Sequence, residues 1–337
     1  MLPGALVGFP PEVPPHPEVS FVVIAYNEAR TIGQALTAIA AQRHHCHREI
    51  VVVDDGSEDD TAAVVRAFAG EHDDVRLLSL PQNLGRGAAR AAGLEAAQSE
   101  LIAFVDSDIV LPPDWLGRCL QEIGDRDAVG GVAVPDGDVG YVYRRFALEP
   151  KVVSATTTVT GNNGLYRRGV FTHGGFDPGL RDGEDVALNH VLHTHGARLL
   201  TITDLHVRHE EHKSFSQSLR WLYQSGLGAA RQLYRYREVR VPDLVFAGWL
   251  ASIVVALTPG RHSNTRKAAP ALYLLATAGG HTARAFVLRG AGPKRVAGAV
   301  LVDTAMLGAY FAGRLHGSLK IADLVRSEQP DHGRRGT

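Results

Sequence analysis

The feature that most constrains the fold is a regular alternation of strand-like and helix-like segments in the first third of the chain. Continuous runs of β-branched and aromatic residues are typical of strands buried on both faces of a sheet. Such runs occupy residues 19–26, 48–55, 75–82 and 101–108. Segments that read as helices follow the first three runs, at residues 28–42, 58–72 and 85–98. This order predicts an α/β, Rossmann-like fold whose mostly parallel central sheet carries helices on both faces.

Polar side chains gather where the predicted strands end, which is the edge at which parallel sheets bind ligands. They are Tyr26, Glu28, Asp54, Asp55, Asn83, Asp106 and Asp108. Asp106 and Asp108 are two positions apart, so at a strand end their carboxylates point to the same side. Two such carboxylates can hold Mg²⁺ or Mn²⁺ and leave coordination positions for phosphate oxygens.

The segment FVDSDIV around Asp106 has a second interpretation. It also fits the nucleophile motif of haloacid-dehalogenase-type phosphohydrolases, in which Asp106 would be the nucleophile. That motif normally opens its domain, whereas three strand–helix units precede Asp106 here. The order of the segments therefore favours a metal-binding pair.

Composition narrows the function classes. A formal net charge of −1 excludes a nucleic-acid or polyanion binder driven by bulk charge. Cys46 and Cys119 lie far apart with no CxxC spacing, so neither a disulfide framework nor a thiolate zinc site is expected. Residues 1–18 are rich in proline and lack the pattern of a secretory signal, which predicts an extended N-terminal arm.

Four segments, VVIAYNEARTI, IVVVDDGSEDDT, NLGRGAARAAG and FVDSD, follow one another at regular intervals. Together they resemble the family 2 glycosyltransferases, which are inverting enzymes with the GT-A fold and a DXD motif. The resemblance extends over roughly residues 19–225. It implies one GT-A domain over residues 19–235, with a nucleotide-binding half at 19–127 and an acceptor half at 128–235.

The resemblance also implies roles for the strand ends. In that family the first strand end and the DDGS loop hold the base and ribose, and the helix after the third strand lies under the nucleotide. The matching positions are Ala25, Tyr26, Glu28, Asp54, Asp55 and, facing a phosphate, Arg86 or Arg90. Asp106 and Asp108 match the DXD motif, which binds the donor diphosphate through Mg²⁺ or Mn²⁺. Of the histidines in LHVRHEEH, we expect His209 to be a third metal ligand, with His206 and His212 as alternatives.

The acceptor half carries two further matches. GGFDPGLRDGEDVAL resembles the catalytic block of the family, which implies that Asp185 is the general base and that Glu184 beside it faces the acceptor. Both would stand at a helix N-terminus, where the helix dipole favours ionised carboxylates. TGNNGLYRR resembles the acceptor-side turn, where Asn162 and Asn163 would bond sugar hydroxyls.

A weaker motif follows. QSLRW, with Gln217, Arg220 and Trp221, fits the QxxRW pattern of processive synthases in the family, where it binds acceptor sugar and donor phosphate. Long uninterrupted apolar helices do not flank it, so a translocating synthase is not expected.

The C-terminal third is predicted to be an apolar helical region at residues 236–325, followed by a polar tail at 326–337. Its apolar stretches are residues 244–260, 268–280 and 296–313. Each is either interrupted by polar residues or shorter than the roughly 20 residues that span a bilayer. Basic residues lie in both intervening turns, contrary to the charge bias of alternating spans. We expect helices that lie in a membrane interface. A soluble helical subdomain or an oligomer interface is the alternative.

The sequence thus predicts a metal-dependent inverting glycosyltransferase. It would move a sugar from a nucleotide-sugar, with UDP favoured on family grounds, to a hydroxyl of a glycan or lipid-linked acceptor. The active site would lie on the cytoplasmic side of a membrane, and the chain could form a homo-oligomer. A phosphohydrolase and a non-catalytic nucleotide-sugar-binding protein are the alternatives.

Overall fold

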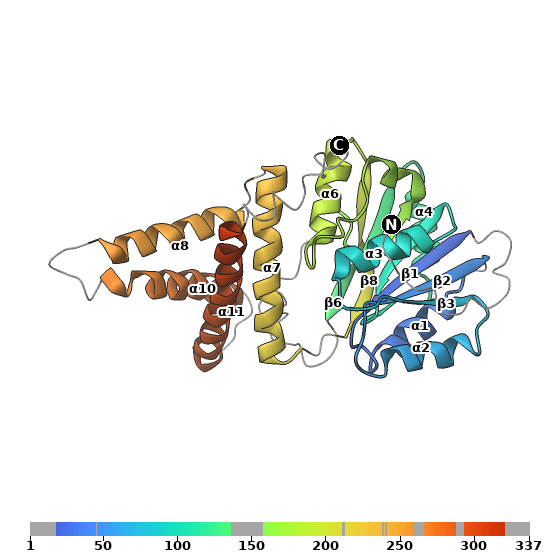
Figure 1. The fold of residues 1–337 in the computed structure, drawn as a ribbon, viewed down its shortest axis with the longest axis horizontal. Helices are drawn as coiled ribbons and strands as arrows, with labels where there is room; N and C mark the ends of the chain where they lie inside the picture. The colour runs from blue at the N-terminus through green and yellow to red at the C-terminus, as the bar shows by residue number, and fades with distance from the viewer. Residues whose placement is uncertain are drawn as a thin grey trace, which may run out of the picture. The chain divides into compact units, whose positions relative to one another are not determined.

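The computed structural model describes residues 18–44, 46–135, 158–210, 213–237, 239, 241–258, 266–287 and 293–320. The chain forms two units, residues 1–138 with 151–211 and residues 139–150 with 212–337. Figure 1 labels their helices and strands. The expected N-terminal arm, apart from residue 18, and the polar tail lie outside the described residues.

The first unit is built on one sheet. Its described residues form eight strands, in the order β3-β2-β1-β4-β7-β6-β8-β5. Strands β1, β2, β3 and β4 run parallel, and β7 is antiparallel to both β4 and β6. Strand β8 runs parallel to β6 and antiparallel to β5. The strands are β1 Val19–Ala25, β2 Arg48–Asp54, β3 Val75–Ser79, β4 Leu101–Asp106, β5 Ile109–Val110, β6 Ala128–Pro135, β7 Asn163–Arg167 and β8 Leu199–His209.

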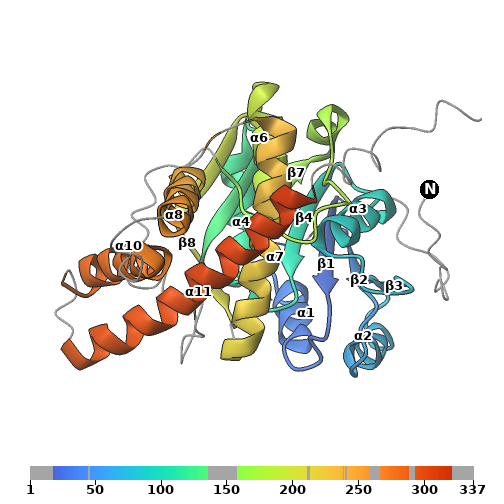
Figure 2. The ribbon, with the colours of Figure 1, turned by 60° about the vertical axis from the view of Figure 1, so that its left-hand side comes forward.

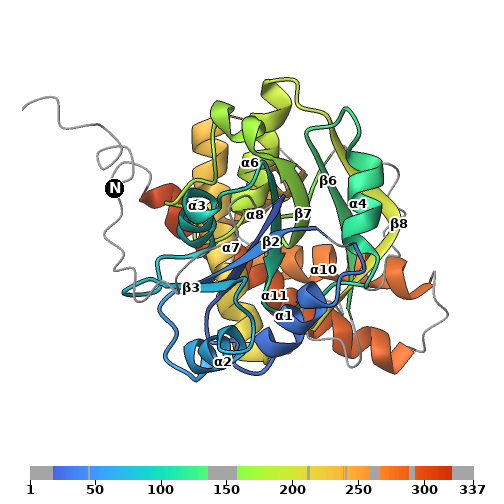
Figure 3. The ribbon, with the colours of Figure 1, turned by 90° about the vertical axis from the view of Figure 1, so that its right-hand side faces the viewer.

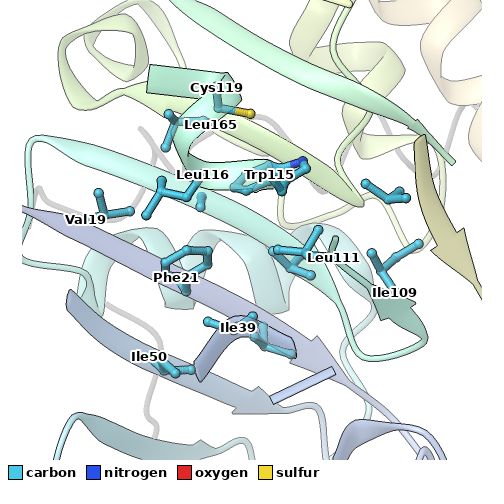
Figure 4. Packing of buried hydrophobic residues seen from close by; sticks show 14 of the residues in the cluster. Val19, Phe21, Ile39, Ile50, Ile109, Leu111, Trp115, Leu116, Cys119 and Leu165 are labelled. Carbon is cyan, nitrogen blue, oxygen red and sulfur yellow. The ribbon is translucent and has the colours of Figure 1, made fainter. Parts of the chain in front are cut away.

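Helices cover both faces of this sheet, as predicted (Figure 3). They are α1 Ile32–Ala40, α2 Thr61–Ala69, α3 Arg86–Ala96, α4 Trp115–Ile123 and α6 Glu184–Thr194, with a 3-10 turn at Arg168–His173. Successive β1 side chains point to opposite faces. Phe21 packs in one hydrophobic cluster, together with Ile39 of α1 and Trp115 of α4 (Figure 4). Val22 packs in the other cluster, with Leu188 of α6.

The order of the strands positions the predicted site. Because β1 lies between β2 and β4, Ala25 pairs with Asp54, and Ile24 pairs with Asp106. The carboxyl ends of three strands therefore meet at one edge of the sheet. The predicted fourth strand is two residues shorter than expected, since β4 ends at Asp106 and the chain turns through Ser107 and Asp108 into β5.

The second unit is helical. Its helices are α7 Phe215–Tyr236, α8 Val241–Leu257, α10 Ala269–Val287 and α11 Pro293–Leu319. Helix α11 crosses α7 (Figure 2), and glycines let the two backbones meet. A Cβ on Gly226 would lie 2.1 Å from the Tyr310 carbonyl oxygen, and one on Gly313 would lie 1.9 Å from the Tyr223 carbonyl oxygen. Helix α7, expected in the domain at 19–235, thus belongs to the helical unit.

Apolar and charged residues mix in these helices. Asp243 and Arg314 form a buried ion pair between α8 and α11, and Asp303 accepts a hydrogen bond from Thr282. Across the described residues, we find no single helix with the length and apolarity to span a bilayer, and only α7 and α8 taken as a bent pair reach that measure.

We predict that Gly313→Ala destabilises the helical unit, because the new methyl group would displace the α7 backbone. Overpacking of this kind costs about 1–3 kcal/mol in the free energy of unfolding. Gly298→Ala on the same helix is the matched control, since no atom lies within 4 Å of its added Cβ. Urea unfolding followed by circular dichroism compares the two. Equal stability of both variants would contradict the close α7–α11 contact.

Candidate active site

The loops that follow β1 and β2 are tied to each other. The backbone N–H of Asn27 donates to Ser57 Oγ over 2.9 Å, and the Glu58 N–H donates to Asn27 Oδ1 over 2.8 Å. Asn27 adopts a left-handed conformation, with φ at 55°, and asparagine tolerates that region better than most residues. Tyr26 beside it is 40% exposed, so its ring is accessible to a ligand. Sequence reasoning overlooked Asn27, although its place between Tyr26 and Glu28 pointed to it.

Asp54 and Asp55 are buried and already engaged in the protein. Asp54 Oδ1 accepts from the Ser57 N–H at 3.0 Å. The Asp55 carboxylate accepts from the N–H groups of Leu84 and Gly85, at 2.7 and 2.8 Å, just before α3 begins. Burial raises the pKa of Asp55, and these two donors oppose the rise. Both oxygens of Asp55 fix the start of α3 against the loop after β2, and its contact with the nucleotide stays a prediction.

Asp108 and His209 lie side by side, as the predicted metal site requires. Their atoms Oδ2 and Nε2 are 3.0 Å apart. The short antiparallel pairing of β5 with β8 brings them together, since Ile109 pairs with His209. The Glu210 N–H also donates to the Asp108 carbonyl oxygen at 2.8 Å. His206, one of the alternatives, is exposed on the same strand, and His212 lies outside the described residues.

Asp106 is held from the protein side. Its Oδ1 accepts from Arg90 Nη2 at 2.7 Å, and its backbone N–H donates to the Asn162 carbonyl oxygen at 3.2 Å. Its side chain keeps 15% of its surface exposed. One carboxylate oxygen is thus taken by Arg90.

These residues fit a divalent cation that is completed by other ligands. Asp108 and His209 present an oxygen and a nitrogen together, and Asp106 has a second carboxylate oxygen. In the part of the chain that the structure describes, no three His, Cys, Asp or Glu side chains are grouped closely enough to hold an ion alone. Mg²⁺ is usually bound by one or two carboxylates together with substrate phosphates and water. The arrangement therefore suits an ion that shares its coordination with a diphosphate.

Arg90 is the buried centre of the site. Its Nε donates to Glu184 Oε1 at 2.8 Å, its Nη1 donates to the Gly161 carbonyl oxygen, and its Nη2 donates to Asp106. Burial by itself would lower the pKa of Arg90, but Asp106 and Glu184 outweigh it and raise the pKa above its usual value. Of the two arginines that were expected to face a phosphate, Arg90 is instead enclosed by protein.

Arg86, one helical turn earlier, pairs with Asp182 at 3.1 Å and is partly exposed. The segment that contains Asp182 is bound at two more points, one on α3 and one in the loop before it. The Gly87 N–H donates to the Leu180 carbonyl oxygen at 3.0 Å, and Arg181 Nη2 donates to the Asn83 carbonyl oxygen at 2.8 Å. If Arg86 binds a phosphate, the same side chain would hold the phosphate and Asp182 together.

The acceptor-side residues meet at the turn before β7. Asp185 Oδ2 accepts from the Gly161 N–H at 3.3 Å, and Asp185 stays half-buried. Glu184 is buried, and burial raises its pKa while Arg90 opposes the rise. Asn163 is fully buried; its Oδ1 accepts from the Gly131 N–H at 2.6 Å, and its amide nitrogen donates to Asn162. Asn162 is the more accessible of the two, and the sugar contacts expected of both stay predictions.

The QxxRW residues lie on α7, in the second unit. Gln217 and Ser214 form a capping box, in which Gln217 Oε1 accepts from the Ser214 N–H at 2.8 Å. Gln217 thus caps α7, and its contact with acceptor sugar or donor phosphate stays a prediction. Arg220 is exposed and Trp221 is partly buried.

Residues 20–183 match the sequence profile of the family described as Glycosyl transferase family 2. Among curated proteins, the succinoglycan biosynthesis protein ExoO of Rhizobium meliloti is 44% identical over 131 residues, which are 39% of this chain and 36% of that protein. The pre-mycofactocin glycosyltransferase of Mycobacterium tuberculosis is 28% identical over 288 residues, 75% of this chain and 58% of that protein. The chain spans less than two thirds of the length of these relatives.

Solved structures share the fold. The mannosyltransferase PcManGT from Pyrobaculum calidifontis, in complex with GDP-Man and Mn²⁺, has a TM-score of 0.60 at 22% identity and covers 90% of this chain and 87% of its own. Residues 1–349 of S. aureus TarS, in complex with UDP-GlcNAc, have a TM-score of 0.50 at 17% identity and cover 93% and 92%. These likenesses confirm the predicted GT-A fold.

The raised pKa of Glu184 predicts a pH-dependent stability. Because the folded chain binds this proton more readily than the unfolded chain, the contribution of Glu184 to the free energy of unfolding falls as pH rises above about 4.3, the usual value of the unfolded residue. Glu184→Gln does not titrate there. The stability of the wild type relative to this variant should therefore fall with rising pH in urea unfolding. A difference that rises with pH would mean that Arg90 outweighs burial. Glu95→Gln, an exposed change on α3, is the control.

Proposed function

The chain belongs to glycosyl transferase family 2, and on that premise we propose that it transfers a sugar from a nucleoside diphosphate sugar to a hydroxyl group. The observation that carries the proposal is the hydrogen-bonded bridge of Arg90 between Asp106, at the end of β4, and Glu184, the neighbour of Asp185. Donor-side and acceptor-side carboxylates thus meet around one cation, at the sheet edge where such folds bind nucleotides.

The donor would bind at the ends of β1, β2 and β4. The exposed ring of Tyr26 can cover the base, and Asp54 can accept from the base or ribose. Asp106, Asp108 and His209 would hold Mg²⁺ or Mn²⁺, which when bound neutralises negative charge on the departing nucleoside diphosphate. UDP is the first donor to test. The two solved neighbours were complexed with a GDP-sugar and a UDP-sugar, so both bases belong in the screen.

Asp185 would act as the general base. Its carboxylate would accept the proton of the acceptor hydroxyl while that oxygen attacks the anomeric carbon. The bond from this carbon to the diphosphate oxygen breaks on the opposite side, so the nucleoside diphosphate leaves and the anomeric configuration inverts. Asn162 and Glu184 would orient the acceptor. Positioning of the two substrates would supply much of the rate.

The acceptor would be a glycan or a lipid-linked sugar at a membrane. Helix α8 supports the membrane part of this proposal, since it is apolar after Asp243 and exposes Leu244, Val254 and Leu257 by 63%, 62% and 78%. Exposed apolar patches of this kind mark membrane or protein interfaces. The name of ExoO places that relative in succinoglycan biosynthesis, which supports a glycan acceptor. The active site would then face the cytoplasm, where nucleotide-sugars are made.

Two other functions are weaker. A phosphohydrolase with Asp106 as nucleophile is disfavoured, because Arg90 holds Asp106 Oδ1 and the chain belongs to a transferase family. A non-catalytic donor-binding protein would keep the same contacts, so turnover is the measurement that separates it from an enzyme.

We predict that Asp106→Ala and Asp185→Asn act on different steps. Asp106→Ala should abolish metal-dependent donor binding, because it removes a proposed metal ligand. Asp185→Asn should spare binding and lower turnover by at least about 100-fold, since a general base contributes typically 10²–10⁴-fold.

The measurements are a thermal-shift screen of UDP- and GDP-sugars with and without Mn²⁺, followed by product formation. Asp73→Asn, at an exposed position before β3, is the matched control. Full turnover by Asp185→Asn would move the base to another residue, and wild-type donor binding without any turnover would favour the non-catalytic alternative.

We predict that the double change Val254→Ser and Leu257→Ser weakens binding to vesicles of phosphatidylglycerol and phosphatidylcholine. Full burial of one such side chain is worth roughly 1.5–3 kcal/mol, so losing two that are half-buried in the membrane should lower partitioning about tenfold or more. Co-sedimentation measures it, with Val186→Ser on α6 as an exposed control. Unchanged partitioning, together with a smaller oligomer in the variant, would instead make α8 a contact between copies of the chain.

A further inference from the structure

The side chain of Arg90 uses all three of its nitrogens on three separate parts of the chain. Nη2 reaches Asp106 at the end of β4, Nε reaches Glu184 at the first position of α6, and Nη1 reaches the Gly161 carbonyl oxygen in the turn before β7. The guanidinium is 2% exposed and lies 5.6 Å from the centre of the Phe176 ring. Lysine, with a single nitrogen, cannot reproduce these three directions.

Gly161 links Arg90 to Asp185, the proposed base, by hydrogen bonds. Its carbonyl oxygen accepts from Arg90, and its N–H donates to Asp185 Oδ2. The fit around it is close: a Cβ on Gly161 would lie 3.0 Å from Arg90 Cζ and 3.1 Å from Asp185 Cβ. The guanidinium, the turn and the base therefore pack directly against one another, and a change in one displaces the others.

We propose that Arg90 is a positioning residue, which holds the donor-side carboxylate Asp106 and the acceptor-side base Asp185 at the separation that sugar transfer needs. The proposal rests on the proposed function. Arg90 touches neither substrate: it acts on the donor through Asp106 and on the acceptor through Glu184 and Gly161. It also leaves the second oxygen of Asp106 for a metal ion or a donor group.

A buried arginine–glutamate pair elsewhere in the first unit provides a matched control. Arg76 on β3 pairs with Glu49, which is fully buried near the start of β2. Asp54, at the end of the same strand, lies five residues further on, so the pair is about 16 Å from the site edge at 3.3 Å per residue. Arg76→Lys breaks a comparable buried contact without touching the site.

The experiment compares wild type, Arg90→Lys and Arg76→Lys in three measurements. These are the thermal midpoint, the Kd for Mn²⁺ with and without nucleoside diphosphate by calorimetry, and kcat and KM for transfer. Arg90→Lys should lower kcat by at least about tenfold at saturating substrates, because misplacement by about 1 Å can cost 100-fold, and should change the Mn²⁺ Kd through Asp106. Arg76→Lys should lower the thermal midpoint and leave kcat and the Mn²⁺ Kd unchanged. Folded Arg90→Lys with kcat and Mn²⁺ Kd within about twofold of wild type overturns the proposal.

A second variant keeps the test decisive if Arg90→Lys does not fold. Gly161→Ala leaves every charge in place and presses on Arg90 and Asp185, so it should lower kcat. Unchanged kcat in Gly161→Ala overturns the proposal. The proposed function fails separately: if wild type transfers no sugar from any UDP- or GDP-sugar, the transferase assignment falls and the Arg90 proposal falls with it, whereas active wild type with unaffected variants rejects Arg90 alone.

Discussion

The buried guanidinium of Arg90 is the interaction on which the rest of the first unit's site depends. Removing a charged group from water costs several kcal/mol, and only good geometry with several hydrogen bonds offsets that cost. Arg90 meets the condition because β4 and β7 are neighbours in the sheet. Their antiparallel register pairs Val105 with Asn163, which brings the end of β4 and the turn that contains Gly161 to the same point. The strand order therefore brings together the groups that stabilise the buried charge of Arg90, and the bonds of Arg90 in turn hold these segments together.

Much of this architecture follows from local patterns. Runs of β-branched residues identify the parallel strands, and their spacing brings Asp54 and Asp106 to one edge of the sheet. The choice of His209 beside Asp108 also agrees with the fold, because β5 and β8 pair at that position. Sequence reasoning succeeded where the deciding interaction lies within one strand or between neighbouring strands.

Several contacts of the candidate site residues involve partners far along the chain. Asp55 caps α3 through Leu84 and Gly85, some thirty positions away, and Asn163 bonds the Gly131 N–H. The motif NLGRGAARAAG contains Leu84 and Gly85 but does not show that their N–H groups bond Asp55, and no motif pairs Gly131 with Asn163. Arg90 lay in a helix of small residues that packing alone could explain. Its importance becomes clear only when β4, the turn before β7 and α6 are folded together, because its three hydrogen-bond acceptors come one from each of them.

The edge of the sheet at the candidate site already carries several negative charges. A nucleoside diphosphate brings at least two negative charges to an edge that already carries Asp54, Asp106 and Asp108. The nearby arginines are committed to the protein: Arg86 pairs with Asp182, Arg90 binds Asp106 and Glu184, and Arg181 binds Asn83. With a net charge of −1, the chain offers no general positive field to offset the ligand. Under the proposed function, a cation that binds together with the diphosphate would offset this charge, and the pairing of Asp108 with His209 provides ligands of the kind such an ion accepts.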